Sequence, residues 1–213
     1  MNKPYDIART WEPQFVNDLL QVLVAALEAR DSYAQGHIKR VAEISLAIGA
    51  RMNLSAIELR DLYAAAILHD IAKSLGTAET TLNKPQQLDQ HEAAIIREHP
   101  FKASLLVVGV DSLTHLMPTI MYHHEHWDGN GYPAKLLGES IPLHARIIGI
   151  ADAFDAMISP RSYRPAMSVD EAVKELLLQK EKQFDPDIVE ILIACLEENR
   201  SEWKDFSYYF CTS

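Results

Sequence analysis

Cysteine is scarce in this sequence. The chain has only Cys195 and Cys211, whose spacing matches neither a metal-binding nor a disulfide pattern. Disulfide-stapled secreted domains and thiolate metal sites both need several cysteines at short spacings, so both classes are disfavoured. A reducing compartment is the default for such a chain, and we expect the protein to be cytoplasmic.

Long apolar runs are also missing. No window approaches the roughly 20 apolar residues that a transmembrane helix requires, so we expect no association with a membrane. The N-terminus has polar and charged residues where a signal peptide has its apolar core. This second absence also favours a cytoplasmic protein.

Basic residues are outnumbered by acidic ones. The chain has 20 Lys and Arg against 30 Asp and Glu, a formal net charge of -10. Binding to a nucleic-acid polymer relies on many contacts between Lys or Arg and phosphates, so we expect no such partner. A small phosphorylated ligand is compatible with this charge, because a bound divalent cation can reverse the local charge of a pocket.

The residues that are present predict helices almost throughout. Hydrophobic residues make up 48% of the chain and recur at helical spacing. Three capping patterns each start a helix: Ser55 with Glu58, Asp89 with Glu92, and Ser168 with Glu171. We predict an all-α fold, with an N-terminal extension over residues 1–14 and one domain over residues 15–213.

Periodicity and proline set the remaining helix boundaries. Helical patterns cover about 15–30, 36–52 and 143–158, and a last helix opens near Pro186. The helix after Asp89 should stop near His99-Pro100, because the residue before proline avoids the helical conformation. Another helix is expected from about Ala103, with a break near Met117-Pro118 before a further helix.

Histidine and aspartate are the candidate metal ligands. The candidates lie in separated segments of the chain: His37, His69, Asp70, His99, His123, His124 and Asp152. Imidazole and carboxylate ligands without thiolate suit Fe, Mn, Zn, Co or Ni. Seven ligands exceed what one ion normally takes, which predicts two metal ions.

A pair of ions suits phosphoryl transfer. Two ions about 3.5–4 Å apart share a bridging carboxylate and clamp the oxygens of an in-line displacement at phosphorus. Asp70, next to His69, is the expected bridge and a candidate catalytic residue. Lys73, three residues after Asp70, is the second candidate catalytic residue, because it can face the same pocket and reach a phosphate oxygen.

Five sequence segments carry a resemblance to a known family. They are GHIKRV (36–41), LHDIAK (68–73), HP (99–100), HHEHWDGNGYP (123–133) and IPLHARIIGIADAFDAMISPRSYR (141–164). Together they resemble the HD-GYP family, bacterial metal-dependent cyclic-dinucleotide phosphodiesterases within the HD phosphohydrolase superfamily. The resemblance covers about Leu19 to Leu192 and implies a single helical bundle with the metal site in its core.

The resemblance also implies roles for individual residues. It assigns metal ligation to the seven candidates, with Fe or Mn as the expected ions and Zn, Co or Ni as alternatives. Tyr33 stands where some members have a third-metal Glu, which favours two ions. Lys73, Arg161 and Arg164 match residues that bind the substrate.

The segment 123–133 (the signature loop) and the residues that support the ligands form a second group. The resemblance implies that this loop shapes the site and contacts other proteins, including diguanylate cyclases of the GGDEF type. We expect supporting roles near the ligands for Arg40, Glu125, Asp128, Gly129, Gly131, Tyr132, Pro133, Arg146 and Asp155.

Four departures from the family pattern bear on substrate preference. Ala72 and Ala103 replace glycines and add methyl groups that can narrow the pocket. Asp89 replaces a Thr, and both are good N-caps. The loop 74–81 is one residue longer than usual.

The expected activity is hydrolysis of cyclic di-GMP to the linear dinucleotide pGpG, to GMP, or to both. Two alternatives stay open. One is a non-catalytic sensor that binds cyclic di-GMP and signals through the signature loop. The other is an HD phosphohydrolase for a different nucleotide, such as cyclic GMP-AMP.

Overall fold

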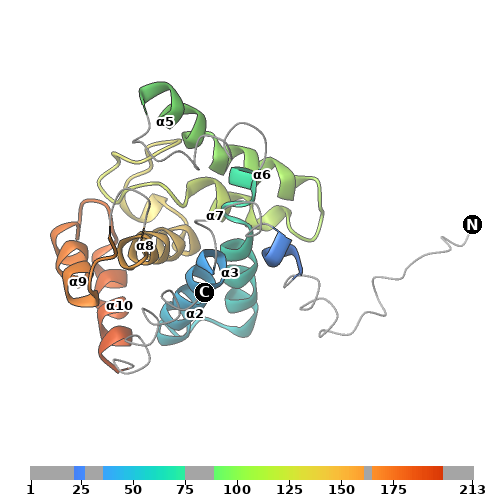
Figure 1. The fold of residues 1–213 in the computed structure, drawn as a ribbon. Coiled ribbons are helices and arrows are strands. Elements are labelled where there is room, and N and C mark those ends of the chain that lie inside the picture. Colours follow the sequence, from blue (N-terminus) through green and yellow to red (C-terminus); the bar gives the residue numbers. More distant parts are fainter. Residues whose placement is uncertain (1–21, 27–35, 75–88, 161–164, 199–213) are drawn as a thin grey trace, which may run out of the picture.

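The computed structural model describes residues 22–26, 36–74, 89–160 and 165–198. Figure 1 shows that these segments form a bundle of helices. Residues 22–26 are helical, and no named strand occurs among the described segments. The named elements are α2 His37–Arg51, α3 Ala56–Leu68, η2 Ile71–Ser74, α5 Gln90–Arg97, α6 His99–Val108, η3 Thr114–Leu116, α7 Met117–Tyr122, η4 Gly138–Ser140, α8 Leu143–Ile158, α9 Val169–Leu178 and α10 Pro186–Glu198. The predicted all-α fold is confirmed.

Local sequence signals set most helix starts. The capping boxes that open α3, α5 and α9 all form, with the N-cap side chain accepting from the backbone N–H three residues on. Helix α8 has the predicted bounds, 143–158. The proposed domain boundary at residue 15 lies outside the described residues, so it stays a prediction.

Two prolines begin helices that the sequence reading placed differently. Helix α6 begins at His99 instead of near Ala103, because Pro100 lies in its first turn, where the missing N–H costs no hydrogen bond. Pro118 likewise lies in the first turn of α7. These prolines therefore mark helix starts, and His99 becomes the first residue of a helix.

Helix α8 lies at the centre of the core. Its residues Ile147, Ile148, Ile150, Ala151 and Phe154 are all fully buried. Helix α2 packs against α8 and α3, while α7, α9 and α10 contact other parts of α8. In Figure 1, α9 and α10 lie on one side of α8, and α2 and α3 lie on the other. None of the described helices has the length and hydropathy needed to cross a bilayer.

Gly149 allows α8 to approach the end of α7 closely. A Cβ added at Gly149 would lie 2.7 Å from the backbone oxygen of His123. Backbone atoms cannot swing away as a side chain can, so a larger residue there must separate the two segments. The absence of a side chain at position 149 therefore permits the backbone of His123 to lie this close to α8.

We predict that Gly149→Ala destabilises the protein by about 1–3 kcal/mol, the usual cost of overpacking a core. Gly109→Ala is the matched control, since its added Cβ would meet its nearest atom at 3.8 Å and its φ is -73°. The control should change stability by no more than about 0.5 kcal/mol. Urea unfolding measures both values, and equal stability of the two variants would contradict the prediction.

Candidate metal centre

Helix ends bring the predicted ligands together. His37 begins α2, His69 and Asp70 follow α3, His99 begins α6, and His123 and His124 follow α7. Only Asp152 lies inside a helix, α8. The seven side chains form two clusters in which one ligand atom of each residue lies within 4.8 Å of the others: Asp70, His99, His123 and His124 (the first cluster), and His37, His69 and Asp152 (the second cluster).

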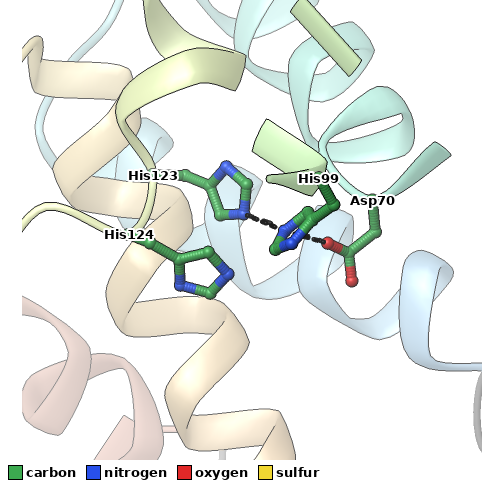
Figure 2. A group of neighbouring side chains, drawn as sticks. All are labelled: Asp70, His99, His123 and His124. Carbon is green, nitrogen blue, oxygen red and sulfur yellow. Dashed lines mark hydrogen bonds and ion pairs between the residues drawn. The ribbon is translucent and has the colours of Figure 1, made fainter. Parts of the chain in front are cut away.

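The first cluster is shown in Figure 2. The Nε2 atom of His99 lies 3.1 Å from Asp70 Oδ1 and 3.4 Å from Nε2 of His123. His123 Nε2 is 3.9 Å from the same Asp70 oxygen. His124 follows His123 directly, and the two rings are 4.2 Å apart between centroids. His99 and His123 therefore both face Oδ1 of Asp70, and His124 completes the cluster.

The second cluster meets the other oxygen of Asp70. Asp70 Oδ2 lies 3.3 Å from Nε2 of His69 and 3.6 Å from Nε2 of His37. His37 Nε2 is also 3.5 Å from Oδ1 of Asp152. The two oxygens of Asp70 thus face different clusters, which is the arrangement that a carboxylate bridging two metal ions requires.

Backbone carbonyls fix the tautomer of three histidines. Nδ1 of His69, His99 and His123 each donates to the carbonyl oxygen three residues earlier, at 2.7 Å in all three cases. A carbonyl can only accept, so Nδ1 carries the proton and Nε2 is left with its lone pair when the ring is neutral. These Nε2 atoms are the ones that point into the clusters.

Unsatisfied atoms in the clusters fit divalent cations. Nε2 of His69 and Oδ1 of Asp70 are buried and have no hydrogen-bond partner among the described residues. Leaving a buried polar atom unpaired costs about 1–3 kcal/mol, and more for a charged group. Ligation by a cation would satisfy both atoms, and nitrogen and oxygen donors without sulfur suit a transition-metal ion.

The charge states in the first cluster suit ligation as well. Burial and the neighbouring histidines hold the pKa of His123 and of His124 well below the usual value. Burial alone would raise the pKa of Asp70, but its interactions with His69, Lys73 and His37 outweigh burial and hold this pKa well below its usual range. The cluster therefore presents neutral imidazoles and an ionised carboxylate, as a metal requires.

His37 has the opposite shift. Burial lowers its pKa, but hydrogen bonds with Asp155 and Asp70 and the charge of Asp152 outweigh burial and raise the pKa to about 10. At neutral pH the metal-free second cluster therefore holds a proton on His37. A cation that binds there must displace this proton.

Lys73 lies beside the proposed bridge. Its Nζ is 2.6 Å from Oδ2 of Asp70, and its side chain is about one-fifth exposed. The lysine side chain thus lies next to the carboxylate and is partly exposed. Its role in binding a substrate phosphate stays a prediction.

The signature loop packs against the first cluster through Tyr132. The Tyr132 ring stacks on His124, with centroids 5.0 Å apart and planes 24° apart. Glu125 fixes the loop by accepting the backbone N–H groups of Ala134 at 2.6 Å and Leu136 at 3.0 Å. The Glu125 carboxylate therefore supports the loop and is not a member of either cluster.

The glycines and Asp128 complete the loop. A Cβ at Gly131 would lie 2.2 Å from the backbone N of His126, so no larger residue fits there. Gly129 adopts a φ of +78°, in the left-handed region. Asp128 accepts the backbone N–H of Asn130 at 3.0 Å, and Pro133 follows Tyr132 through a cis bond. These residues shape the loop and lie outside both clusters.

The predicted arginines fall in different places. Arg40 pairs with Asp155, which also accepts from Nδ1 of His37 at 2.8 Å. Arg146 pairs instead with Asp185 at 2.5 Å, away from the clusters but along a cavity of about 160 Å³ that reaches His124 and Asp152. Arg161, Arg164 and Tyr33 lie outside the described residues.

Sequence reasoning missed Arg97. Its guanidinium lies 5.8 Å from the centroid of the Tyr132 ring, so it sits over the residue that stacks on His124. The only signal in the sequence is its place two residues before His99. That spacing does not predict a role for Arg97, because the contact between the end of α5 and the signature loop is not visible in the sequence.

The family departures leave the clusters intact. Ala72 and Ala103 are buried, so their methyl groups pack in the core. Asp89 caps α5 as expected. Residues 75–81 of the longer loop lie outside the described residues.

We predict that metal binding releases a proton from His37. At pH 8 this residue is protonated in the metal-free protein, since its pKa is about 10, whereas His123 and His124 are already neutral. Affinity for Mn(II) should rise with pH until His37 loses its proton unaided. Calorimetric titration in buffers of different ionisation enthalpy measures the release, and identical heats in all buffers would refute it.

Comparison with known proteins shows which family this chain resembles. A profile of the HD domain family matches residues 21–188. The cyclic di-GMP phosphodiesterase response regulator RpfG of Xanthomonas campestris is 34% identical over 83% of this chain and 47% of its own length. A cyclic di-GMP phosphodiesterase of Vibrio cholerae is 36% identical over 88% of this chain and 41% of its own length. The 3'3'-cGAMP-specific phosphodiesterase 2 of the same organism is 34% identical over 85% of this chain and 35% of its own length.

Solved structures have the same fold. The cyclic GMP-AMP phosphodiesterase V-cGAP3 of V. cholerae matches with a TM-score of 0.70 at 22% identity, over 91% of this chain and 52% of that chain. The present chain spans less than half the length of the three curated relatives. With the HD profile covering most of its residues and the HD and GYP segments in place, the chain belongs to the HD domain family, in its HD-GYP branch.

Proposed function

We propose that this chain is a metal-dependent phosphodiesterase that hydrolyses cyclic di-GMP to pGpG, to GMP, or to both. The observation that carries the proposal is the buried carboxylate of Asp70, whose two oxygens face two separate ligand clusters. Bridged pairs of metal ions are typical of enzymes that cleave phosphate esters. The curated relatives named as cyclic di-GMP phosphodiesterases support the substrate.

The two clusters are proposed to hold two divalent transition-metal ions, Fe or Mn, with Zn, Co and Ni as alternatives. The first cluster offers three imidazoles and a carboxylate, and the second offers two imidazoles and a carboxylate, with Asp70 shared. When bound, such ions stabilise negative charge on phosphate oxygens and lower the pKa of a water molecule.

The residues of the chain would position the phosphate. Lys73 reaches Asp70 from a partly exposed position, and its ammonium group can bind a non-bridging phosphate oxygen of the substrate. Arg161 and Arg164 are proposed to bind phosphate or guanine. The cavity beside His124 and Asp152 offers space next to the clusters for part of the ligand.

The signature loop is proposed to contact other proteins, including GGDEF-type diguanylate cyclases. Glu125 fixes its backbone, and Leu137, four residues after Pro133, is 64% exposed, which leaves an apolar side chain available at the surface. The proposal also includes a cytoplasmic location, in keeping with the scarcity of cysteine.

A second candidate substrate is 3'3'-cyclic GMP-AMP. A relative that carries this specificity in its name is as similar to the chain as one named for cyclic di-GMP, at 34% identity each. The alternative to an enzyme is a non-catalytic sensor that binds cyclic di-GMP without hydrolysing it. The intact clusters favour an enzyme over the sensor.

We predict that the purified chain hydrolyses cyclic di-GMP when supplied with Mn(II) or, without oxygen, Fe(II). Asp70→Asn should lower the rate by more than about a hundredfold, because losing a ligand outweighs the 10–100-fold cost of losing a ligand's support. Chromatography of the products, with 3'3'-cyclic GMP-AMP in parallel, measures both substrates. Tight binding without turnover in the wild type would establish the sensor instead.

We predict that Lys73→Met lowers kcat by about 10²–10³-fold, the usual cost of removing one donor to developing negative charge. Its metal content should stay at the wild-type level, because the lysine is not a ligand. Lys102→Met is the control, since Lys102 is exposed on α6 and pairs only with Glu98 in the described ion pairs. Unchanged kcat in Lys73→Met would contradict the assigned role.

A further inference from the structure

Asp155 supports His37 from inside the core. It lies three residues after Asp152 on α8, and its side chain is only 1% exposed. His37 donates from Nδ1 to Asp155 Oδ2 at 2.8 Å. Arg40 donates from Nε to Oδ1 and from Nη2 to Oδ2, the latter at 3.1 Å. Both oxygens of Asp155 are thus engaged by donors.

The local sequence at the start of α2 favours this pair. Gly36 has a φ of +72°, and a Cβ there would lie 2.5 Å from Nη1 of Arg40. A side chain at position 36 would therefore push the guanidinium away from Asp155. Ser159 also holds the guanidinium, accepting from Nη2 at 3.1 Å. Gly36 consequently leaves room for Arg40, and Arg40 and His37 both donate to Asp155.

His37 differs from the other oriented ligands in what holds its ring. Nδ1 of His69, His99 and His123 donates to main-chain carbonyls, which no substitution can turn into donors. Nδ1 of His37 donates to a side chain. A change at position 155 can therefore alter the tautomer of His37 and leave the tautomers in the first cluster as they are.

We propose that Asp155 and Arg40 are positioning residues that set metal affinity in the second cluster alone. This inference rests on the metal centre of the proposed function. With Asp155→Asn, Arg40 can only donate, so it takes the amide oxygen, and the amide NH2 is left to face Nδ1 of His37. Nδ1 must then accept, so the neutral ring carries its proton on Nε2, where it blocks ligation. An Asp-to-Asn change that reverses a histidine tautomer is known from the serine-protease triad.

The chain offers a matched control in Asp185. Asp185 is also buried and also pairs with an arginine, Arg146 of α8, at 2.5 Å. Its other oxygen accepts the backbone N–H groups of Asp187 and Ile188, a role that Asn can fill. It contacts no member of either cluster among the described interactions. Asp185→Asn therefore breaks a comparable ion pair without touching a ligand.

The test is titration of the metal-free full chain with Mn(II), followed by calorimetry and by elemental analysis after dialysis. We expect two ions per wild-type chain. Asp155→Asn should weaken one of the two positions by about 10–100-fold and leave the other unchanged, which is the usual cost of losing a ligand's support. Asp185→Asn should bind both ions as the wild type does. Nitrogen-15 NMR of the metal-free imidazoles should show that one ring has lost its Nδ1 proton in Asp155→Asn.

Three results would overturn the inference: two ions bound by Asp155→Asn with wild-type affinity, equal weakening of both positions, or a wild type that binds fewer than two ions. If Asp155→Asn fails to fold, Arg40→Lys keeps the charge but loses the two-pronged contact. Arg40→Lys should weaken Mn(II) binding at the same single position several-fold. Binding of both ions with wild-type affinity would refute the inference. A wild type that binds two ions but hydrolyses no cyclic dinucleotide would refute only the enzyme proposal.

Discussion

Asp70 places a negative charge inside the helical bundle, where one of its oxygens has no hydrogen-bond partner among the described residues. An ionised carboxylate buried without compensation costs several kcal/mol. The positive charge of Lys73 offsets part of that cost from one side. The histidines on the other side offer lone pairs, which a cation can join to the carboxylate. The centre of the bundle therefore suits a bound cation, and the surrounding helices place the ligand side chains around that position.

Helix ends make this arrangement feasible. A ligand at the first or last residue of a helix can be placed at the centre of the bundle while the rest of the helix packs through apolar residues. His99 gains its place because Pro100 starts α6 directly after it. Asp152 is the exception: it lies inside α8, and Nε2 of His37 lies 3.5 Å from its carboxylate.

Much of this fold follows from local sequence signals. The capping boxes and the apolar spacing act within a few residues, so Ser55, Asp89 and Ser168 could be assigned before any tertiary contact was known. The two helix starts at Pro100 and Pro118 were harder, because proline both ends and begins helices. The sequence could also propose which residues are ligands, through a resemblance. It could not predict how they divide into clusters, or that Arg97 lies over Tyr132, because both depend on how distant helices pack.

The close approach at Gly149 has a consequence for the spacing of the ligands. His123 belongs to one cluster and Asp152, one helical turn beyond Gly149, belongs to the other. The contact that separates their two segments is between backbones, so it does not depend on which apolar side chains fill the surrounding core. Core residues can therefore change over evolutionary time, through swaps of similar volume, without altering the distance between the two clusters. The spacing of the ligands therefore does not depend on the identity of the apolar side chains in the surrounding core.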